Sequence, residues 1–376
     1  MAINNIAYPS GSPSAQDTLW HVFGSDVTSD DFKYVMDIFV GGTQQVRVKL
    51  YPDPTNGRGY FDAGMIVRNT FTYEWLTPKN TVLMCEPSAS GEIAQTYNYR
   101  IGEEYSGVTY LNLASGNVTA YNWTAPLFKR KVSDLSVYNN KAMSNRPSII
   151  NASLGDNIFI GAKDVSGLVV STYNNSNVKI ADTSISLGST KAFAQLNIGT
   201  PALNNPTEII NTAVKYYTVT IGGSTFRVNL DCNQMYQSYN LHFMNHLGMF
   251  DTAKFDLASR LNMNVTRKNF TKRDYNLNNS SVTYYDTNNK YVSSNIDYLN
   301  KKDHTYKLTM NAPTDAEYEW LAELIDSPQV YFELDGYYYP VTMKIDSYEY
   351  SKYVNNRLRV FEVEIDLNQP RYSQLR

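Results

Sequence analysis

The pattern of apolar and polar positions is dominated by short alternating stretches that pair around glycine turns. Residues 32–40 alternate with period two, Gly41-Gly42 follows, and residues 46–51 alternate again. Period two is typical of a half-buried strand, and glycine supplies the positive φ of a tight hairpin turn. Residues 214–230 repeat this arrangement around Gly222-Gly223. The sequence therefore predicts two similar hairpins and raises the hypothesis of an internal duplication.

Further strands are expected on the same grounds. Residues 330–345 hold two alternating stretches around Asp335-Gly336, which predicts a third hairpin. A fourth is predicted from a strand at 108–113 with its turn at 115–117. Between residues 131 and 210 the chain is rich in Asn, Ser and Thr, and it holds three short strand-like pieces at 158–160, 168–170 and 193–196.

One stretch has a helical period instead. Thr314 and Glu317 have the spacing of a capping box, and apolar residues recur at helical spacing up to Ile325, before Ser327-Pro328 ends the pattern. The expected core side chains of this helix are Tyr318, Leu321, Leu324 and Ile325. Weaker helical patterns occur at 253–261 and, as a single turn, at 63–69.

These elements predict a mainly β protein with a minor α+β part. We expect several β-hairpins in sandwich- or barrel-like domains, plus one short helix near the C-terminus. The predicted segments are an extended N-terminal arm at 1–17, a β-rich domain at 18–130, an Asn/Ser/Thr-rich β insertion at 131–210, and a C-terminal β-rich domain at 211–376 with a helix at 314–326. The first 17 residues are called an arm because they show no apolar period.

Composition narrows the possible functions. The formal charge of −3 and the short basic runs do not provide the clustered cations that bind nucleic-acid backbones. Cys85 and Cys232 are expected to be reduced, and neither a secretory signal nor a membrane-spanning stretch is recognised, so we expect synthesis and folding in a cytoplasm. The 31 tyrosines are suited to half-buried strands and to protein–protein interfaces.

Few residues suggest chemistry. His242 and His246 have the i, i+4 spacing of a helical zinc site, but an acidic third ligand is not apparent, and packing is the favoured interpretation. Gly57-Arg58-Gly59 does not match a phosphate-binding loop and is interpreted as a turn before a short helix capped by Asp62. The carboxylate pairs Glu103/Glu104 and Asp315/Glu317 could form a glycosidase dyad only with suitable geometry. We therefore predict no catalytic, cofactor-binding or metal residues.

Two stretches resemble a known group of proteins. Residues 32–62, with a hairpin followed by Pro52-Asp53-Pro54 and Gly59-Tyr60-Phe61-Asp62, resemble the opening of tail and collar ring proteins of crAss-like and related phages of Bacteroidota. Residues 241–255 are similar to the segment these proteins carry before their C-terminal domain, and residues 320–331 fit the same group. The resemblance covers roughly the first hundred and the last hundred and forty residues.

This resemblance implies a structural virion protein, not an enzyme, that forms a ring in the phage tail or collar below the portal. Its implied partners are copies of itself in a closed ring, neighbouring tail, collar or portal proteins, and DNA that passes through without specific contacts. No membrane partner and no cofactor are expected. The alternative is a β-sandwich receptor- or glycan-binding module of a phage fibre, in which Trp75 and Trp123 could stack on sugar rings. A hydrolase on a β scaffold is the third possibility.

Overall fold

The computed structural model confirms a mainly β fold with several sheets and one helix longer than two turns. It describes residues 3–72, 80–87, 91–124, 134–231, 235–278, 280–285, 290–311, 314–344, 360–368 and 371–372. The chain divides into two compact units. The first unit comprises residues 1–233, 242–253 and 326–328, and the second comprises 234–241, 254–325 and 329–376. The predicted boundaries at 130 and 210 both lie within the first unit.

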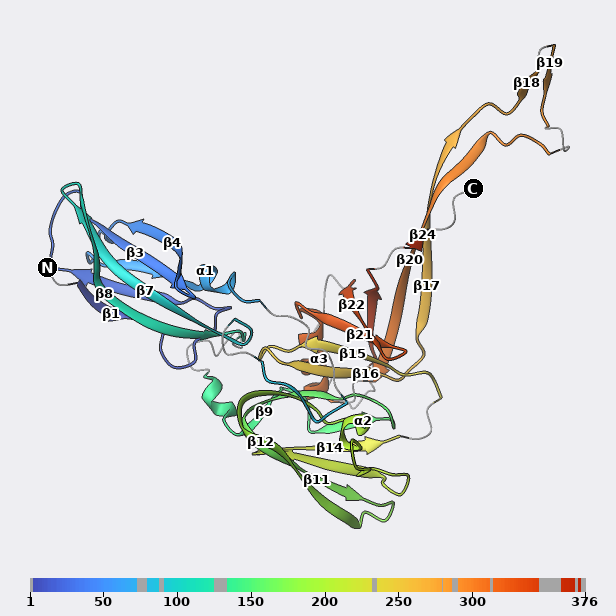
Figure 1. The fold of residues 1–376 in the computed structure, drawn as a ribbon, viewed down its shortest axis with the longest axis horizontal. Coiled ribbons are helices and arrows are strands. Elements are labelled where there is room, and N and C mark those ends of the chain that lie inside the picture. Colours follow the sequence, from blue (N-terminus) through green and yellow to red (C-terminus); the bar gives the residue numbers. More distant parts are fainter. Residues whose placement is uncertain are drawn as a thin grey trace. The chain divides into compact units, whose positions relative to one another are not determined.

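The first unit begins with a β-sandwich (Figure 1). One of its sheets has the order β1-β2-β5, and the other has the order β4-β3-β7-β8. Their bounds are β1 Ile3–Ala7, β2 Trp20–Ser25, β3 Lys33–Val40, β4 Thr43–Leu50, β5 Gly59–Asp62, β7 Ala94–Tyr105 and β8 Val108–Tyr121. Alternate residues of β3 and β7, including Tyr34, Met36, Tyr97 and Ile101, point into one core with Phe23 of β2. This packing explains the period-two pattern in the sequence.

The predicted N-terminal arm is wrong, because residues 3–15 belong to this sandwich. β1 pairs antiparallel with β2, and Ile3 is buried in the shared core. Further along, the amide of Ala15 donates to the carbonyl oxygen of Tyr121, and the Ser14 hydroxyl donates to the Trp123 carbonyl oxygen. The segment lacks an apolar period because only Ile3, Ser14 and Ala15 of these residues are buried.

Both glycine hairpins are confirmed, and the predicted turn at 115–117 is wrong. Gly41 and Gly42 have positive φ between β3 and β4, and Gly222 does so between β13 (Tyr216–Ile221) and β14 (Ser224–Leu230). Residues 115–117 instead lie inside β8, which runs without a break from Val108 to Tyr121. The turn that pairs β8 with β7 is Ser106-Gly107, where both residues have positive φ.

A six-stranded sheet completes most of the first unit, in the order β10-β14-β13-β11-β12-β6. Its other strands are β6 Leu83–Cys85, β10 Ile149–Ala152, β11 Phe159–Tyr173 and β12 Lys179–Asn197. The pieces predicted at 158–160 and 168–170 fall mainly within the single strand β11. Since β11 pairs with β13, residues on both sides of 210 share one sheet, so 131–210 is not a separate insertion. Around it lie η1 (Leu135–Tyr138), β9 (Lys141–Met143) and α2 (Thr200–Leu203).

The two glycine hairpins occupy equivalent places in their sheets. The order β14-β13-β11-β12 is antiparallel throughout and matches β4-β3-β7-β8, with a long hairpin beside the first strand of each glycine hairpin. In the chain, however, the long hairpin precedes the glycine hairpin in one sheet and follows it in the other. A simple tandem copy would keep the same chain order, so the duplication stays a hypothesis.

The remaining large sheet has the order β16-β15-β21-β22-β23-β20-β17, with β24 beside β20. Its strands are β15 Tyr239–Met244, β16 Phe250–Phe255, β17 Arg260–Thr271, β20 Asn295–Asn311, β21 Val330–Leu334, β22 Tyr337–Met343, β23 Val360–Asp366 and β24 Arg371–Tyr372. The weaker helix predicted at 253–261 is wrong, because these residues contribute to β16 and β17. Buried Ala253 and Phe255 follow the alternation of a strand.

Two helices and one hairpin follow the sequence closely. α3 (Asp315–Ile325) starts with the predicted capping box, in which the Thr314 hydroxyl accepts from the Glu317 amide and the Glu317 carboxylate accepts from the Thr314 amide. β21 and β22 turn at Asp335-Gly336. α1 (Gly64–Arg68) forms the turn of helix expected near residue 63. Among the described residues, no helix is long and apolar enough to cross a membrane.

Candidate interaction surface on the long hairpin

The second unit carries a long two-stranded ribbon, which we call the hairpin arm and define as residues 260–303. Within it, β17 pairs with β20 from Arg260 to Thr271, and β18 (Asn276–Asn278) and β19 (Ser281–Thr283) form a smaller hairpin at the far end. Figure 1 shows β17 and β20 continuing beyond β24, which lies beside β20, with β18 and β19 at the tip. The arm therefore leaves most of its length without a covering sheet.

The side chains of β17 in the arm are far more exposed than those of β3 in the N-terminal sandwich. All side chains of β17 are exposed except that of Val265, which is half-buried. β3, by contrast, has five buried positions in a row. An isolated two-stranded ribbon is marginally stable in water, and an unpaired edge strand offers its backbone groups to other chains. β17 is such an edge, because only β20 lies beside it in the sheet.

The arm also exposes apolar side chains at positions that share a face. Leu261 and Met263 are 54% and 55% exposed, and the period of a strand places Val265 on the same face. We call these three residues the apolar stripe. The far end of the arm adds a second group of exposed large side chains, namely Leu277, Val282, Tyr284, Tyr285 and Tyr291. Exposed tyrosines of this kind are common anchors of protein interfaces.

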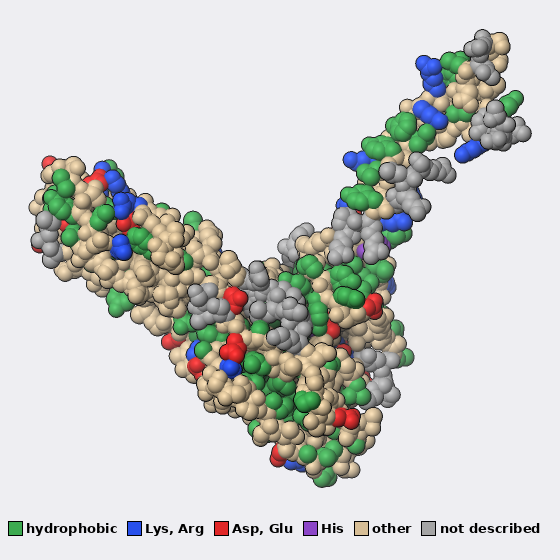
Figure 2. All heavy atoms as spheres, viewed as in Figure 1, with side chains coloured by type: hydrophobic (Ala, Val, Ile, Leu, Met, Phe, Trp, Pro, Cys, Tyr) green, Lys and Arg blue, Asp and Glu red, His purple; other side chains and the backbone are tan. Residues whose placement is uncertain are grey.

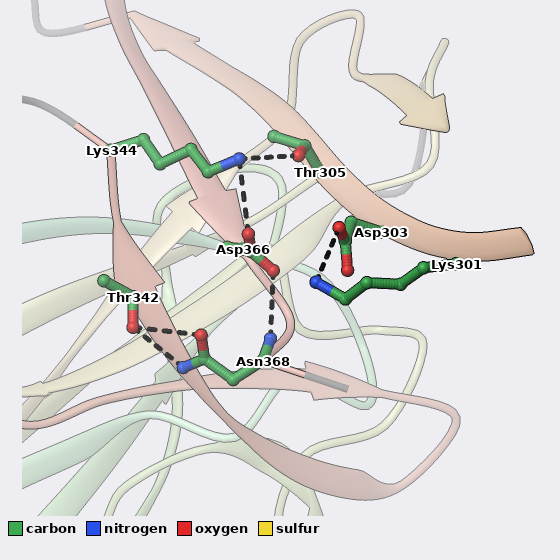
Figure 3. Close-up of polar contacts among 7 residues, drawn as sticks. All are labelled: Lys301, Asp303, Thr305, Thr342, Lys344, Asp366 and Asn368. Atoms are coloured by element: carbon green, nitrogen blue, oxygen red, sulfur yellow. Dashed lines mark hydrogen bonds and ion pairs between the residues drawn. The ribbon is translucent and has the colours of Figure 1, made fainter. Parts of the chain in front are cut away.

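The base of the arm is held by polar contacts (Figure 3). Lys344 donates to the Thr305 hydroxyl at 3.0 Å and forms an ion pair with Asp366 at 3.3 Å, which ties β20 to the ends of β22 and β23. Beside them, Thr342 and Asn368 exchange hydrogen bonds. Partial burial acts to raise the pKa of Asp366, but the Asn368 amide and the Lys344 ammonium outweigh it and hold that pKa below its usual value.

The charge of the arm differs from that of the remaining chain. Residues 260–303 contain eight Lys or Arg and four Asp, a net charge of +4, so the other residues together carry −7 of the total of −3. Lys301 forms an ion pair with Asp303 near the base. Figure 2 shows Lys and Arg side chains spaced along the ribbon among hydrophobic ones on the face in view.

Four cations on the arm stand out. Within the described part of the chain, no acidic partner lies within ion-pair distance of Arg267, Lys268, Lys272 or Arg273, and all four are exposed. Many cations elsewhere are paired, as Arg47 is with Asp37 and Lys49 with Glu104. Positive charge that is spaced along an exposed ribbon and left without internal partners is available to an external one.

The two histidines whose spacing matches a helical zinc site have separate partners in the structure. They lie on a strand and the turn after it, so the helical argument for a shared face does not apply. His242 is buried on β15, where its Nδ1 lies 2.8 Å from the Thr252 hydroxyl and its ring stacks on Phe159. His246 is partly exposed and lies 2.9 Å from Asp326. Among the residues described, no group of three or more His, Cys, Asp or Glu could hold a metal ion.

The carboxylate pairs have structural surroundings. Glu103 and Glu104 are neighbours on β7 and so point to opposite faces. Glu103 is buried and accepts from the Ser25 hydroxyl. Glu104 accepts hydrogen bonds from Lys49 and from the Thr109 hydroxyl, and these two bonds, chiefly the one from Lys49, lower the pKa of Glu104. Glu317 is engaged in the cap of α3, next to Asp315 in the first turn. Neither pair has the facing geometry of a glycosidase dyad.

The glycine-rich segment at 57–59 and the tryptophan Trp123 both have structural roles. Gly57 has positive φ in the predicted turn, but Gly59 begins β5, where a Cβ would lie 2.2 Å from the ring of Phe23. Asp62 accepts from the Gly64 amide just before α1, but the N-cap residue of that helix is Ala63, not Asp62 as predicted. Trp123 is buried and donates to the Ser12 carbonyl oxygen, so its ring is not available for stacking on a sugar. Trp75 and Cys232 lie outside the described residues.

Sequence reasoning did not single out the arm. Residues 260–271 alternate between apolar and polar types only at Leu261, Met263 and Val265, and Asn interrupts the rest of the pattern. The usable signal was the local charge, because the cations of residues 260–303 outnumber the acids two to one in a chain that is acidic overall. Each basic run of this segment is short, so its positive charge becomes visible only when it is summed over residues 260–303.

Comparisons with known proteins do not assign a family. No family model and no curated protein matches the chain. Among solved structures, it is similar to the FN1–FN3 domains of chicken CNTN1 (10% identity, 60% of this chain and 62% of that one, TM-score 0.20). It is also similar to a Ca²⁺-stabilised adhesin with which an Antarctic bacterium binds ice (8% identity, 98% and 91%, 0.19) and to the BSP domain of a biofilm-associated protein (8%, 81% and 64%, 0.16). The chain thus spans less than two thirds of the CNTN1 fragment, and TM-scores this low carry no inference about function.

Proposed function

We propose that this protein is a structural subunit of a homo-oligomeric assembly and that its hairpin arm makes contacts between subunits. The observation that carries the proposal is β17, a twelve-residue edge strand whose side chains are almost all exposed. Such a ribbon gains little stability from the chain that bears it, and an adjoining molecule can supply the missing cover. Its apolar stripe and exposed tyrosines are suited to a protein surface.

The resemblance to tail and collar ring proteins supports a particular setting for this assembly. We propose a ring in the tail or collar of a bacteriophage, made in the host cytoplasm and carried in the virion, with neighbouring ring proteins as further partners. The chain has no proposed catalytic role. A subunit of a closed ring meets its neighbours through two different faces, and a projecting hairpin can form one of them.

The alternative of a glycan-binding module now has less support. It named tyrosines and two tryptophans for stacking on sugars. Trp123 is buried under the N-terminal segment, and Trp75 lies outside the described residues. The exposed aromatic residues of the arm, Phe270 and several tyrosines, are spread along a two-stranded ribbon, whereas small ligands usually bind in a concave site.

The proposal is tested by the mass of the native protein before and after the arm is shortened. Met263 and His304 face each other across the ladder, so residues 264–303 can be replaced by Asn-Gly, a sequence that favours a two-residue hairpin turn. We expect full-length protein to form a large closed oligomer by light scattering. The shortened variant should remain monomeric, with a circular dichroism spectrum that is still typical of a folded β protein.

Two results would contradict the proposal. One is a full-length protein that stays monomeric at every concentration, because the chain would then not assemble with itself. The other is a shortened variant that forms the same oligomer, because the contacts would then lie elsewhere. Incorporation of both proteins into phage particles during infection provides the corresponding measurement in the virion.

A further inference from the structure

We propose that the hairpin arm of one copy docks on the remainder of a second copy, not on another arm. This inference rests on the proposed function and specifies its contact. We call the residues outside 260–303 the body of the chain. The proposed contact joins two different surfaces, the arm of one subunit and the body of the next, so that each subunit both donates and accepts an arm.

The first argument is charge. Every arm carries a net charge of +4, so two arms placed side by side repel each other. The body carries a net charge of −7 and therefore attracts an arm. Arg267, Lys268, Lys272 and Arg273, which have no acidic partner among the described residues, lie in the second half of β17 and just after it, where a contact with another copy would neutralise them. Charge complementarity of this kind directs association and selects the partner.

The second argument separates a protein partner from a nucleic acid. A basic ribbon with exposed tyrosines could also contact a phosphate backbone and stack on bases. The arm, however, exposes aliphatic side chains at Leu261, Met263, Leu277 and Val282, which are about half exposed or more. Aliphatic groups gain free energy by leaving water for an apolar surface, and a phosphate backbone offers none. A second copy of this chain can satisfy both the charges and the apolar groups.

The test mixes full-length protein with the variant in which Asn-Gly replaces residues 264–303. That variant lacks residues 264–303, which include Arg267, Lys268, Lys272, Arg273 and the far end of the arm, but it keeps the body together with Leu261 and Met263 at the start of the arm. It can therefore accept an arm without donating a complete one. We expect fluorescently labelled shortened protein to enter complexes with full-length protein and to reduce the size of the oligomers, because each shortened copy ends a chain of contacts. Mass photometry of the mixture measures both effects.

A charge-reversed full-length protein provides the second part of the experiment. The substitutions Arg267→Glu, Lys268→Glu, Lys272→Glu and Arg273→Glu alter exposed side chains without acidic partners among the described residues, so the fold should be retained. We expect the dissociation constant for the labelled shortened protein to rise about 100-fold. For the unaltered protein, raising NaCl from about 0.05 to 0.5 M should raise this constant about tenfold. The control is Asn262→Ser with Asn264→Ser, which leaves charge unchanged.

The outcomes distinguish this inference from the proposed function. If the shortened variant is monomeric alone but never enters complexes with full-length protein, arms contact arms and the inference is wrong, while the proposed function stands. Normal assembly of the charge-reversed protein also overturns the inference. If the shortened variant assembles alone, the proposed function fails first. Tight, salt-dependent binding of a 20-base-pair DNA duplex, lost on charge reversal while assembly persists, would assign the cations to nucleic acid instead.

Discussion

His21 shows how burial sets the state of a single side chain in the N-terminal sandwich. Its ring is fully buried on β2, with Nε2 2.9 Å from the Tyr97 hydroxyl and the ring 4.5 Å from that of Tyr99. Burial lowers the pKa of His21 from 6.5 to about 4, although the nearby Asp62 carboxylate acts to raise it. His21 is therefore neutral in the folded protein at neutral pH.

The first prediction concerns the pH dependence of stability. Because the folded pKa lies below the unfolded value, the unfolded chain binds a proton at His21 first as the pH falls. The contribution of His21 to the free energy of unfolding should be fully present above pH 6.5. It should decrease by up to about 3 kcal/mol as the pH falls to about 4. Urea titrations from pH 7.5 to 4.5 measure the slope. His21→Gln should flatten it, and an unchanged slope would show that His21 does not control it.

The second prediction concerns the core of α3. Leu321 and Leu324 are fully buried as predicted, while Tyr318 and Ile325 are only half-buried, and Trp320 takes a place in the core that the sequence analysis had not assigned. Leu321→Ala should lower the free energy of unfolding by about 2–5 kcal/mol, because it leaves a cavity. Ala316→Ser, on the exposed side of the helix, is the control. A loss below about 0.5 kcal/mol at Leu321, the scale of a surface substitution, would contradict this packing.

At the scale of elements, the N-terminal segment changes most in interpretation. β1 is a strand whose inner face contributes Ile3 to the sandwich core and whose outer face exposes Ile6. Removing the segment would also remove the Ser14 and Ala15 contacts with the end of β8. A deletion of residues 1–15 is therefore expected to destabilise the sandwich instead of leaving the fold intact.

The third prediction uses these two isoleucines as a matched pair on β1. Ile3 is 8% exposed and Ile6 is 45% exposed. Ile3→Ser should cost about 2–4 kcal/mol of unfolding free energy, because it loses core packing and buries a hydroxyl. Ile6→Ser should cost below about 1 kcal/mol. Thermal denaturation of both variants measures the difference. Equal effects would show that Ile3 does not pack in the core and that β1 is a loosely attached segment.

At the scale of the whole molecule, the hairpin arm is the element that the chain does not cover with its own residues. Its base is fixed to β22 and β23 by Lys344, Thr305 and Asp366, so the ribbon starts from a defined direction. A ribbon held at one end loses less conformational freedom on docking than a flexible tail does, which favours a specific contact.

The fourth prediction tests the apolar stripe in assembly. Leu261→Ser with Met263→Ser should raise the protein concentration needed for half-maximal assembly by about 30-fold, since two half-exposed side chains lose the burial they would gain. Asn262→Ser with Asn264→Ser, on the opposite face of the same strand, should leave assembly unchanged. Sedimentation velocity over a concentration series measures both. Equal behaviour of the two double variants would exclude this face from the contact.

The sequence by itself determined the local elements. Gly41-Gly42, Gly222-Gly223 and Asp335-Gly336 predicted their hairpins because positive φ is strongly restricted by residue type. The cap of α3 was equally readable, because Thr314 and Glu317 interact with backbone groups only three residues away. Fold class followed from these elements, since alternating strands require sheets that pack against one another.

Tertiary structure decided what depends on residues far apart in the chain. The sequence could not reveal that β1 joins β2, that β11 pairs with β13 across the predicted boundary at 210, or that Glu103 is buried and accepts from the Ser25 hydroxyl. It also could not show that β17 has a neighbour on one side only. A strand has the same local pattern whether its partner lies in the same chain or in another molecule, so only the assembled sheet reveals which edge stays open.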